Sequence, residues 1–582
     1  MTFDDFREIW VLDFEFGEDK DHLPSLRCLV AKEILKQRVL RIWFDDSKPI
    51  KNPFLRPKNS LFLAYYASAE MGCFLKLKWD LPLYLIDLYA EFRNFTNGLH
   101  LPLGRGLLGA LGYFGVSHIE SSEKEEMRTL ALRGGDYNFE ERQSLINYCE
   151  SDVLATEALW GKLKHHVDFS RAIIRGYYIK ALSEVEHRGV PFDKPLYLNL
   201  KNNWNEIQGR LIEKIDAHFK VFEGRVFKKD RFEEYLKKNL MSWPRLESGV
   251  LDLKDETFRQ MAKKYPVISP LRELRDSLSK MRLNDFQVGS DSKSRVLLSP
   301  FSSKTGRNQP SNSRFVFGSS VWLRSLIKPQ KGRGLAYVDW SQQEFGIAGA
   351  LSKDEKMIES YQSSDPYLSF AKHAGQVPET ATKESHPKER SLFKATVLAV
   401  QYGMGAKSLA ESISVPLEEA KHLLLLHRRT FSKFWRWSEG CVDYILTNKR
   451  IWTTFGWQLK LSGEINTRSL ANFPMQANGA EMMRIAMIQM VKEGIEVCAP
   501  VHDAFLIEAP LENLEKSVHK AQEIMAEASR TVLKVMKLKT DAELISYPDR
   551  FIDQERGGVF FDSVMEILQE IQKAQSLSKQ HN

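Results

Sequence analysis

The chain has 582 residues and a net charge of +7, with 83 Lys and Arg against 76 Asp and Glu. That length allows about three or four domains, and a basic excess of this size fits a polyanionic partner. The five cysteines are scattered without a Cys-x-x-Cys pair, and no apolar run is long enough to span a bilayer. We therefore exclude a disulfide framework, a zinc site and a membrane protein, and expect a cytoplasmic protein without a signal peptide.

The first strong signal is a pair of carboxylates on a predicted strand. An apolar run leads into Asp13-Phe-Glu15, and residues two apart on a strand point to the same face. These two carboxylates can therefore share metal ions. Further along, Tyr148 and Asp152 are four residues apart in a helical pattern and so lie on one face of that helix.

Two further acidic motifs lie in the C-terminal half. A short apolar run rich in strand formers ends on Asp339, and a helical pattern follows from about Glu344. Near the end of the chain two apolar runs flank the polar pair His502-Asp503, which predicts a hairpin with Asp503 at its tip.

A cationic helix is predicted between those motifs. Arg390, Lys394, Leu398 and Tyr402 recur every fourth residue and share one broad helix face, and Gly403 follows. Arg and Lys one turn apart can bind a polyphosphate, Arg through its forked guanidinium and Lys as a point charge. Two aspartates separated by such a helix predict a two-metal phosphoryl-transfer site.

The order of these motifs resembles motifs A, B and C of family A DNA polymerases. Thr305-Gly306-Arg307 is similar to that family's segment at the primer-template minor groove. Thr453 to Trp457 is similar to its turn after motif B, and Arg468 to Gln476 to its template and minor-groove helix. The N-terminal third resembles the DEDD 3′→5′ exonucleases in their tyrosine form.

The resemblance implies a multidomain α/β and α+β chain, in which an RNase H-like exonuclease domain precedes a right-hand polymerase. We expect the exonuclease domain at residues 1–165, a connector and thumb at 166–300, palm at 301–351 and 431–546, fingers at 352–430, and a C-terminal helix and tail at 547–582.

The resemblance also implies roles in polymerisation. Asp339 and Asp503 are expected to hold two Mg²⁺, for which Mn²⁺ can substitute, and Lys394 to be a proton donor to pyrophosphate. Glu344 is expected to be a steric gate against a 2′-hydroxyl, hydrogen-bonded to Tyr402. The residues expected to bind the nucleotide are Arg390, Lys394, Tyr402, Glu344, Leu398 and Tyr367. Those expected to bind DNA are Arg307, Arg468, Asn472, Gln476 and His502. Of these, Arg307 and Gln476 are expected to donate to purine N3 and pyrimidine O2, acceptors present in every correct pair.

In the exonuclease site, Asp13, Glu15 and Asp152 are expected to hold two Mg²⁺, and Tyr148 to orient or deprotonate the attacking water. The fourth carboxylate is open between two residues. Glu70 occupies the position of the family's second motif, where Asp is usual, and we favour it. Asp87 is the alternative, although it aligns better with a structural Asp further along in the family.

Four positions depart from the family pattern. Leu398 stands where the family has Phe or Tyr, and Ala504 replaces the usual Glu after His-Asp. Gly346 replaces an Arg, and Tyr367 stands where many members have a phosphate-binding His. Because Asp339, Lys394 and Asp503 are all retained, we expect an active but divergent enzyme.

The compact exonuclease-polymerase resembles bacteriophage replicative enzymes. Glu70 in its Ala-Ser-Ala-Glu context, with Leu398 and Ala504, is similar to the phage branch that copies 2-aminoadenine in place of adenine. Expected partners are primer-template DNA, deoxynucleoside triphosphates and replisome proteins such as a helicase, a primase and a single-strand binding protein. We expect a monomer in the host cytoplasm. The alternatives are a single-subunit RNA polymerase, against which Glu344 and Gln476 argue, and an exonuclease or DNA-binding protein on an inactive polymerase scaffold.

Overall fold

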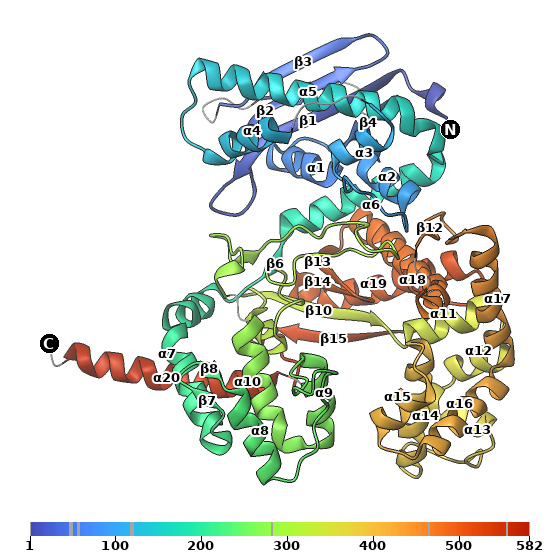
Figure 1. Cartoon of the computed structure of the whole chain (residues 1–582). Coiled ribbons are helices and arrows are strands. Elements are labelled where there is room, and N and C mark those ends of the chain that lie inside the picture. Colours follow the sequence, from blue (N-terminus) through green and yellow to red (C-terminus); the bar gives the residue numbers. More distant parts are fainter. Residues whose placement is uncertain are drawn as a thin grey trace. The chain divides into compact units, whose positions relative to one another are not determined.

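The computed structural model describes residues 2–45, 50–54, 59–116, 121–280, 283–463, 466–554 and 557–580. The chain divides into two compact units, and its elements are labelled in Figure 1. The first unit contains Met1–Arg188, Leu298–Gln309 and Ala336–Leu544; the second contains Gly189–Leu297, Pro310–Leu335 and Ile545–Asn582. All the predicted site residues lie in the first unit.

The N-terminal part of the first unit is built on a five-stranded sheet in the order β3-β2-β1-β4-β5. The central strand β1 pairs antiparallel with β2 and parallel with β4, and a bulge follows Glu15. The strands are β1 (Glu8–Glu18), β2 (Pro24–Glu33), β3 (Arg38–Trp43), β4 (Ser60–Ala64) and β5 (Tyr84–Asp87). The strand predicted around Asp13 and Glu15 is thus confirmed as the centre of the sheet.

Helices pack on this sheet and carry the remaining acidic residues. The long helix α5 begins with a capping box, in which Asn138 and Glu141 exchange side-chain to backbone hydrogen bonds of 2.9 Å. It contacts β1 and β2, the strands that form the antiparallel part of the sheet. The helices are α1 (Ala67–Lys76), α2 (Leu88–Thr96), α3 (Leu107–Tyr113), α4 (Ser121–Arg133) and α5 (Phe139–Leu163).

The second sheet of the first unit has four strands in the order β13-β14-β10-β15. Both sequence predictions for this region are confirmed, because a strand ends just after Asp339 and an antiparallel hairpin encloses His502-Asp503. The strands are β10 (Arg333–Trp340), β13 (Glu496–Val501), β14 (Ala504–Pro510) and β15 (Thr540–Ser546). The helices α6 (Phe169–Arg188), α18 (Thr467–Lys492) and α19 (Leu514–Leu533) pack around it, and a small hairpin joins β11 (Arg450–Trp452) to β12 (Gln458–Lys460).

The segment between β10 and α18 in the sequence is helical (yellow to orange in Figure 1). Its helices are α11 (Gln343–Ser352), α12 (Glu355–Gln362), α13 (Pro366–His373), α14 (Pro387–Gln401), α15 (Ala406–Ile413), α16 (Leu417–Thr430) and α17 (Ser432–Asn448). Phe370 packs against the rings of Phe393, His427 and Phe431, and this buried cluster fixes α14 against α13 and α16. Burial lowers the pKa of His427 to about 3, so this imidazole is neutral.

The second unit is mainly helical. Its helices are α7 (Lys194–Phe219), α8 (Lys229–Lys238), α9 (Asp255–Lys264), α10 (Ser269–Lys280) and α20 (Gly558–Gln580). Two short strand pairs, β6 (Val190–Pro191) with β9 (Lys293–Ser294) and β7 (Phe222–Glu223) with β8 (Val226–Phe227), complete it. Across the described residues of both units, no helix combines the length and the apolar character needed to cross a membrane.

Candidate active sites

Two aspartates that are far apart in the sequence meet at the edge of the four-stranded sheet. β10 carries Asp339, and the backbone N–H of the next residue, Trp340, donates to the carbonyl of Asp503 at 3.1 Å. Asp503 lies in the two-residue turn between β13 and β14, where His502 has a left-handed φ of 54°. The strand end and the hairpin tip are therefore joined directly by the backbone.

The environment of these carboxylates disfavours their charge. Burial first, and then the negative charges of Asp503 and Asp541, raise the pKa of Asp339 to about 6. Burial also raises the pKa of Asp503, while His502 and Arg307 oppose that shift. Carboxylates held close together in a partly desolvated place are stabilised when a cation is bound between them.

Arg307 lies at this acidic edge, as does Glu344 in the first turn of α11. The Arg307 guanidinium donates to the Glu344 carboxylate over 3.5 Å. Burial raises the pKa of Glu344, and the charge of Arg307 opposes this. The hydrogen bond expected between Glu344 and Tyr402 is wrong for this structure, because Tyr402 is 55 % exposed at the end of α14 and Glu344 interacts with Arg307 instead.

The cationic helix is confirmed as α14, which ends before Tyr402. Arg390 is held by an ion pair with Asp365, whose other oxygen caps α13 through hydrogen bonds of 3.1 Å from Tyr367 and Leu368. Arg390 and Lys394 lie 5.7 and 5.9 Å from the ring centre of the buried Tyr367. The three residues thus form one group.

The other residues expected to bind nucleotide or DNA lie on α14, on α18 and in the turn between β13 and β14. Leu398 is half-buried on α14, below the exposed Lys394. Gly403 has a φ of 63°, and a Cβ there would come within 2.4 Å of the Arg468 side chain, so the end of α14 packs on the start of α18. Asn472 and Gln476 follow on α18, one turn apart and half-buried. His502 is exposed. Among the described residues, no hydrogen bond or ion pair joins the α14 cations to the two aspartates.

Asp541 is a neighbour that the sequence analysis missed. It lies on β15, the edge strand next to β10, and accepts a hydrogen bond from the Ser341 hydroxyl. Its charge reaches Asp339, as the pKa of Asp339 shows. Asp541 lies in a polar strand whose sequence pattern does not indicate a site. Only the strand order of the sheet brings it next to Asp339.

A second acidic cluster forms on the five-stranded sheet. Carboxylate oxygens of Asp13, Glu15 and Asp152 all lie within 4.8 Å of one another, in a geometry able to hold a metal ion. Tyr148 is 7 % exposed one turn before Asp152, and its pKa is raised by burial first and then by the charge of Asp152. The Tyr148 hydroxyl therefore remains protonated at neutral pH.

The structure separates the two candidates for the fourth carboxylate. Glu70 is buried on α1, and its pKa is raised by burial and by the charges of Asp13 and Glu15. Asp87 instead caps α2, since one of its oxygens accepts from the backbone of Tyr66 at 2.9 Å and of Tyr89 at 3.0 Å. Burial raises the pKa of Asp87 to about 7.

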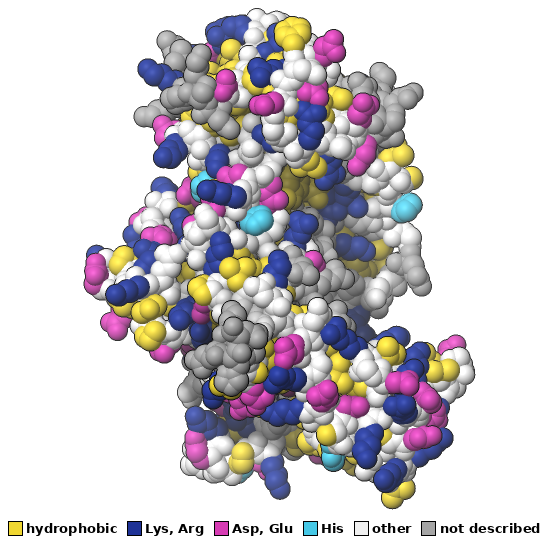
Figure 2. All heavy atoms as spheres, turned by 90° about the vertical axis from the view of Figure 1, so that its left-hand side faces the viewer, with side chains coloured by type: hydrophobic (Ala, Val, Ile, Leu, Met, Phe, Trp, Pro, Cys, Tyr) yellow, Lys and Arg dark blue, Asp and Glu magenta, His cyan; other side chains and the backbone are white. Residues whose placement is uncertain are grey.

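The donor atoms of both clusters fit a hard divalent cation. Each cluster offers carboxylate oxygens, the ligands that Mg²⁺ and Mn²⁺ prefer. Glu70 and Asp87 each have one buried oxygen without a hydrogen-bond partner among the described residues. At Glu70, which the charges of Asp13 and Glu15 reach, a bound metal or its water would supply that partner. Figure 2 shows Lys and Arg side chains interspersed with Asp and Glu over the visible face, so the basic excess does not gather there in one patch.

Comparison with known proteins agrees with this geometry. Residues 310–544 match the family model for DNA polymerase family A. The thermostable DNA polymerase I of Thermus aquaticus is 28 % identical over 217 residues, which cover 35 % of this chain and 26 % of that protein. DNA polymerase I of Aquifex aeolicus is 23 % identical over 406 residues, covering 64 % of this chain and 66 % of that protein. The matched region thus spans about a quarter of the Thermus relative.

One solved structure shares the fold over most of the chain. It is described as the POL domain of Pol1 from M. smegmatis in complex with DNA primer-template and dNTP. The TM-score is 0.70 over 93 % of this chain and 95 % of that chain, at 18 % sequence identity. The similarity at this identity establishes the architecture.

Proposed function

We propose that the chain is a DNA-templated DNA polymerase with a 3′→5′ proofreading exonuclease. One observation carries the polymerase assignment: the backbone bond from Trp340 to Asp503 joins the strand that carries Asp339 to the hairpin tip, inside the family A region. Arg307 and Glu344 border the same two aspartates. DNA primer-template and dNTP, both present in the structurally similar complex, are the proposed substrates.

In the proposed mechanism Asp339 and Asp503 hold two divalent metal ions. Metals bound there would supply activation of the primer 3′-hydroxyl and stabilisation of the charge that develops on phosphorus. Arg390 leaves Asp365 to bind the triphosphate, and Lys394, already exposed on the same face, neutralises it and can protonate pyrophosphate. Nucleotide binding thus competes with the ion pair between Arg390 and Asp365.

Sugar selection is proposed to rest on Glu344. We propose that its half-buried carboxylate, which Arg307 holds, occupies the space that a 2′-hydroxyl would need. Burial of a carboxylate against that hydroxyl disfavours ribonucleotides. Equal incorporation of ribo- and deoxynucleotides would instead favour the single-subunit RNA polymerase.

For the exonuclease, we propose that Asp13, Glu15, Glu70 and Asp152 hold two metals. Glu70 is supported over Asp87 by its electrostatic coupling to Asp13 and Glu15. Because Tyr148 keeps its proton, we assign it to orienting the attacking water through its hydroxyl and not to acting as a base.

The finer assignment is a bacteriophage replicative enzyme that prefers 2-aminoadenine. The extra amino group of that base lies in the minor groove, the side that Arg307 and Gln476 are proposed to probe. A competition assay with both purine triphosphates opposite thymine tests it, and equal use or a preference for adenine would refute it.

The central test is a gel assay on a labelled primer-template with Mg²⁺, using matched and mismatched 3′ ends. Asp339→Ala should abolish extension and keep trimming, whereas Asp13→Ala should abolish trimming and keep extension. Trimming without extension by the wild type would contradict the polymerase assignment and favour an exonuclease on an inactive scaffold. DNA binding with neither activity would favour a DNA-binding protein.

A further inference from the structure

The segment that carries Arg307 has little regular secondary structure of its own. Residues 301–307, here called the arginine segment, form a tight turn. The backbone N–H of Gly306 donates to the Ser303 carbonyl at 3.1 Å, and the backbone N–H of Arg307 donates to the Ser303 hydroxyl at 2.8 Å. Three carbonyls before or within this turn, those of residues 301, 302 and 304, have no strand or helix partner. Buried carbonyls need a donor from elsewhere.

Those donors come from α2 of the N-terminal sheet domain and from Asn97, the residue that follows its last turn. The Arg93 guanidinium donates to the carbonyls of Phe301 at 3.0 Å and Ser302 at 2.5 Å. The Asn97 amide donates to the carbonyl of Lys304 at 2.6 Å. Both donor side chains are buried, Arg93 at 6 % and Asn97 at 1 % exposure, so water cannot easily replace them.

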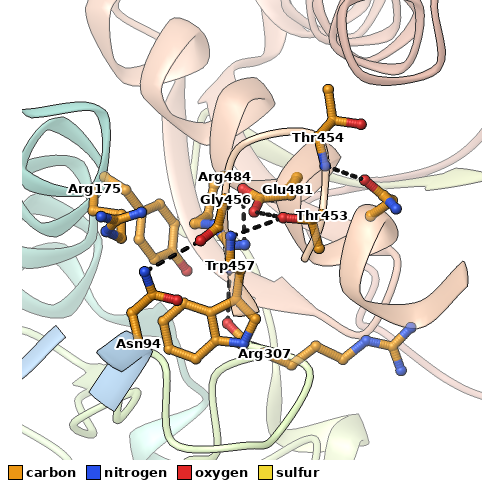
Figure 3. Close-up of polar contacts among 12 residues, drawn as sticks. Asn94, Arg175, Arg307, Thr453, Thr454, Gly456, Trp457, Glu481 and Arg484 are labelled. Carbon is orange, nitrogen blue, oxygen red and sulfur yellow. Dashed lines mark hydrogen bonds and ion pairs between the residues drawn. The ribbon is translucent and has the colours of Figure 1, made fainter. Parts of the chain in front are cut away.

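The same amide also ties α2 to the palm hairpin. Asn97 donates a second bond, of 2.7 Å, to the carbonyl of Gln458 at the start of β12. The neighbouring Asn94 donates to the carbonyl of Gly456 at 3.2 Å and accepts from the backbone of Gln458 at 2.8 Å. Figure 3 shows Asn94, Gly456 and Trp457 at this junction.

The palm holds the arginine segment from its other side. The Trp457 indole donates to the Lys304 carbonyl at 3.0 Å, and its ring stacks on Phe301 at 5.1 Å. Gly306, with a φ of 75°, lies so close to Trp457 that a Cβ would approach the indole to 3.0 Å. Arg484, paired with Glu481, donates to the Gly306 carbonyl at 2.8 Å. Arg307 extends from this clamped turn (Figure 3).

We propose that Asn97, together with Arg93, is a positioning residue for Arg307. The N-terminal domain would then contribute to primer-terminus recognition in the polymerase site, apart from any trimming of its own. Removing Arg93 takes the side-chain donors from the carbonyls of Phe301 and Ser302, and removing Asn97 leaves the Lys304 carbonyl with the Trp457 indole alone. The turn then shifts, and Arg307 loses its alignment with the minor groove. This inference rests on the proposed function, because it takes Arg307 to contact the primer terminus.

The experiment measures how much the minor-groove hydrogen bond from Arg307 contributes to the rate of extension. Single-nucleotide extension is measured under single-turnover conditions on two primers, one ending in guanine and one in 3-deazaguanine, which lacks the N3 acceptor but keeps its pairing edge. All proteins carry Asp13→Ala so that trimming does not interfere. The parent should extend the analogue about tenfold more slowly, the value of one hydrogen bond to a charged group. Arg307→Ala should be slow on both primers and lose that penalty.

Asn97→Ala should reduce the penalty to about threefold or less, since a misaligned Arg307 forms only part of that bond. Arg93→Lys, which keeps the charge but loses the forked pair of donors, should reduce it in the same direction. Ser462→Ala is the matched control: it removes a 2.5 Å bond to the Gly98 carbonyl at the same junction and leaves the arginine segment untouched, so its penalty should equal that of the parent.

The results distinguish a failure of the positioning role from a failure of the proposed polymerase function. If Asn97→Ala and Arg93→Lys slow both primers equally and keep the full analogue penalty, the residues only stabilise the fold and the positioning role is overturned. A parent that extends both primers at one rate overturns it as well, because Arg307 then reads no acceptor. A parent that extends neither primer refutes the proposed polymerase function, and the inference with it. Retained trimming of single-stranded DNA by Asn97→Ala with Asp13 restored shows that α2 is still folded.

Discussion

The proposed assignment of Glu70, and not Asp87, as the fourth carboxylate of an exonuclease site gives opposite expectations for two single substitutions. Asp87→Asn keeps an oxygen that can accept from Tyr66 and Tyr89, so α2 stays capped and trimming should remain within about twofold of wild type. Glu70→Gln removes a charge next to Asp13 and Glu15, and trimming should fall by at least about a hundredfold, more than the loss of an outer metal-site partner costs.

Because the pKa of Asp87 is raised, the Asp87→Asn substitution should also change how the free energy of unfolding depends on pH. Its folded value of about 7 lies above the usual 3.8, so the folded state binds the proton more tightly than the unfolded state. Stability therefore falls as pH rises from about 4 to about 7, and the full cost of about 4 kcal/mol applies above pH 7. Between pH 5 and pH 8 the stability of the wild type falls by about 3 kcal/mol, because about two pH units of this range lie below the folded pKa of Asp87. Asparagine carries no such cost.

Native-state hydrogen exchange of β4 and β5, measured in EDTA at pH 5 and pH 8, reports this difference. The opening free energy of Asp87→Asn relative to wild type should rise by about 3 kcal/mol between these two pH values, whatever the offset at pH 5. An unchanged difference would refute the reasoning from burial. Loss of trimming in Asp87→Asn with retention in Glu70→Gln would make Asp87 the metal ligand.

Three further predictions concern the polymerase site. Divalent-metal affinity, measured by calorimetry in the Asp13→Ala protein, should fall about tenfold per pH unit below pH 6, because Asp339 must lose its proton to bind a cation. Asp541→Asn removes a like charge and should move that midpoint to lower pH; an unchanged midpoint would show that Asp541 is electrostatically silent. Gly403→Ala should destabilise the junction of α14 and α18 by at least about 1–2 kcal/mol, because its left-handed φ disfavours alanine and the new Cβ would strike Arg468. Thermal unfolding checks this, and Arg468→Ala should recover the part due to the clash.

Local patterns predicted well the secondary structure that carries the expected site residues. The helical pattern expected from about Glu344 is α11, Gln343–Ser352, and the hairpin expected around His502-Asp503 has both residues in its turn. In each case the signal lies within about a dozen residues, where periodicity and turn chemistry act directly. The family resemblance supplied the order of the motifs, and residues 310–544 do match family A.

Contacts between distant segments were not predictable in the same way. Nothing in the sequence near Asp541 indicates that β15 lies beside β10, because strand order depends on the whole sheet. The partner of Glu344 was misassigned for a related reason. The resemblance pointed to Tyr402 on α14, but Arg307 approaches from a loop whose position depends on packing against other segments.

Asn97 shows why such contacts escape a sequence pattern. Read locally, it ends a short helix, and an asparagine there needs no explanation beyond the cap. Its amide in fact donates to the carbonyls of Lys304 and Gln458, which lie in two segments far from α2 along the chain. The Asn97 side chain is buried, so replacing it removes a donor from two segments at once, and the Lys304 carbonyl then keeps only the Trp457 indole. A residue in that position can transmit a displacement from one domain to the other without touching substrate, which is why the analogue-sensitive primer, and not the extension rate alone, decides what it does.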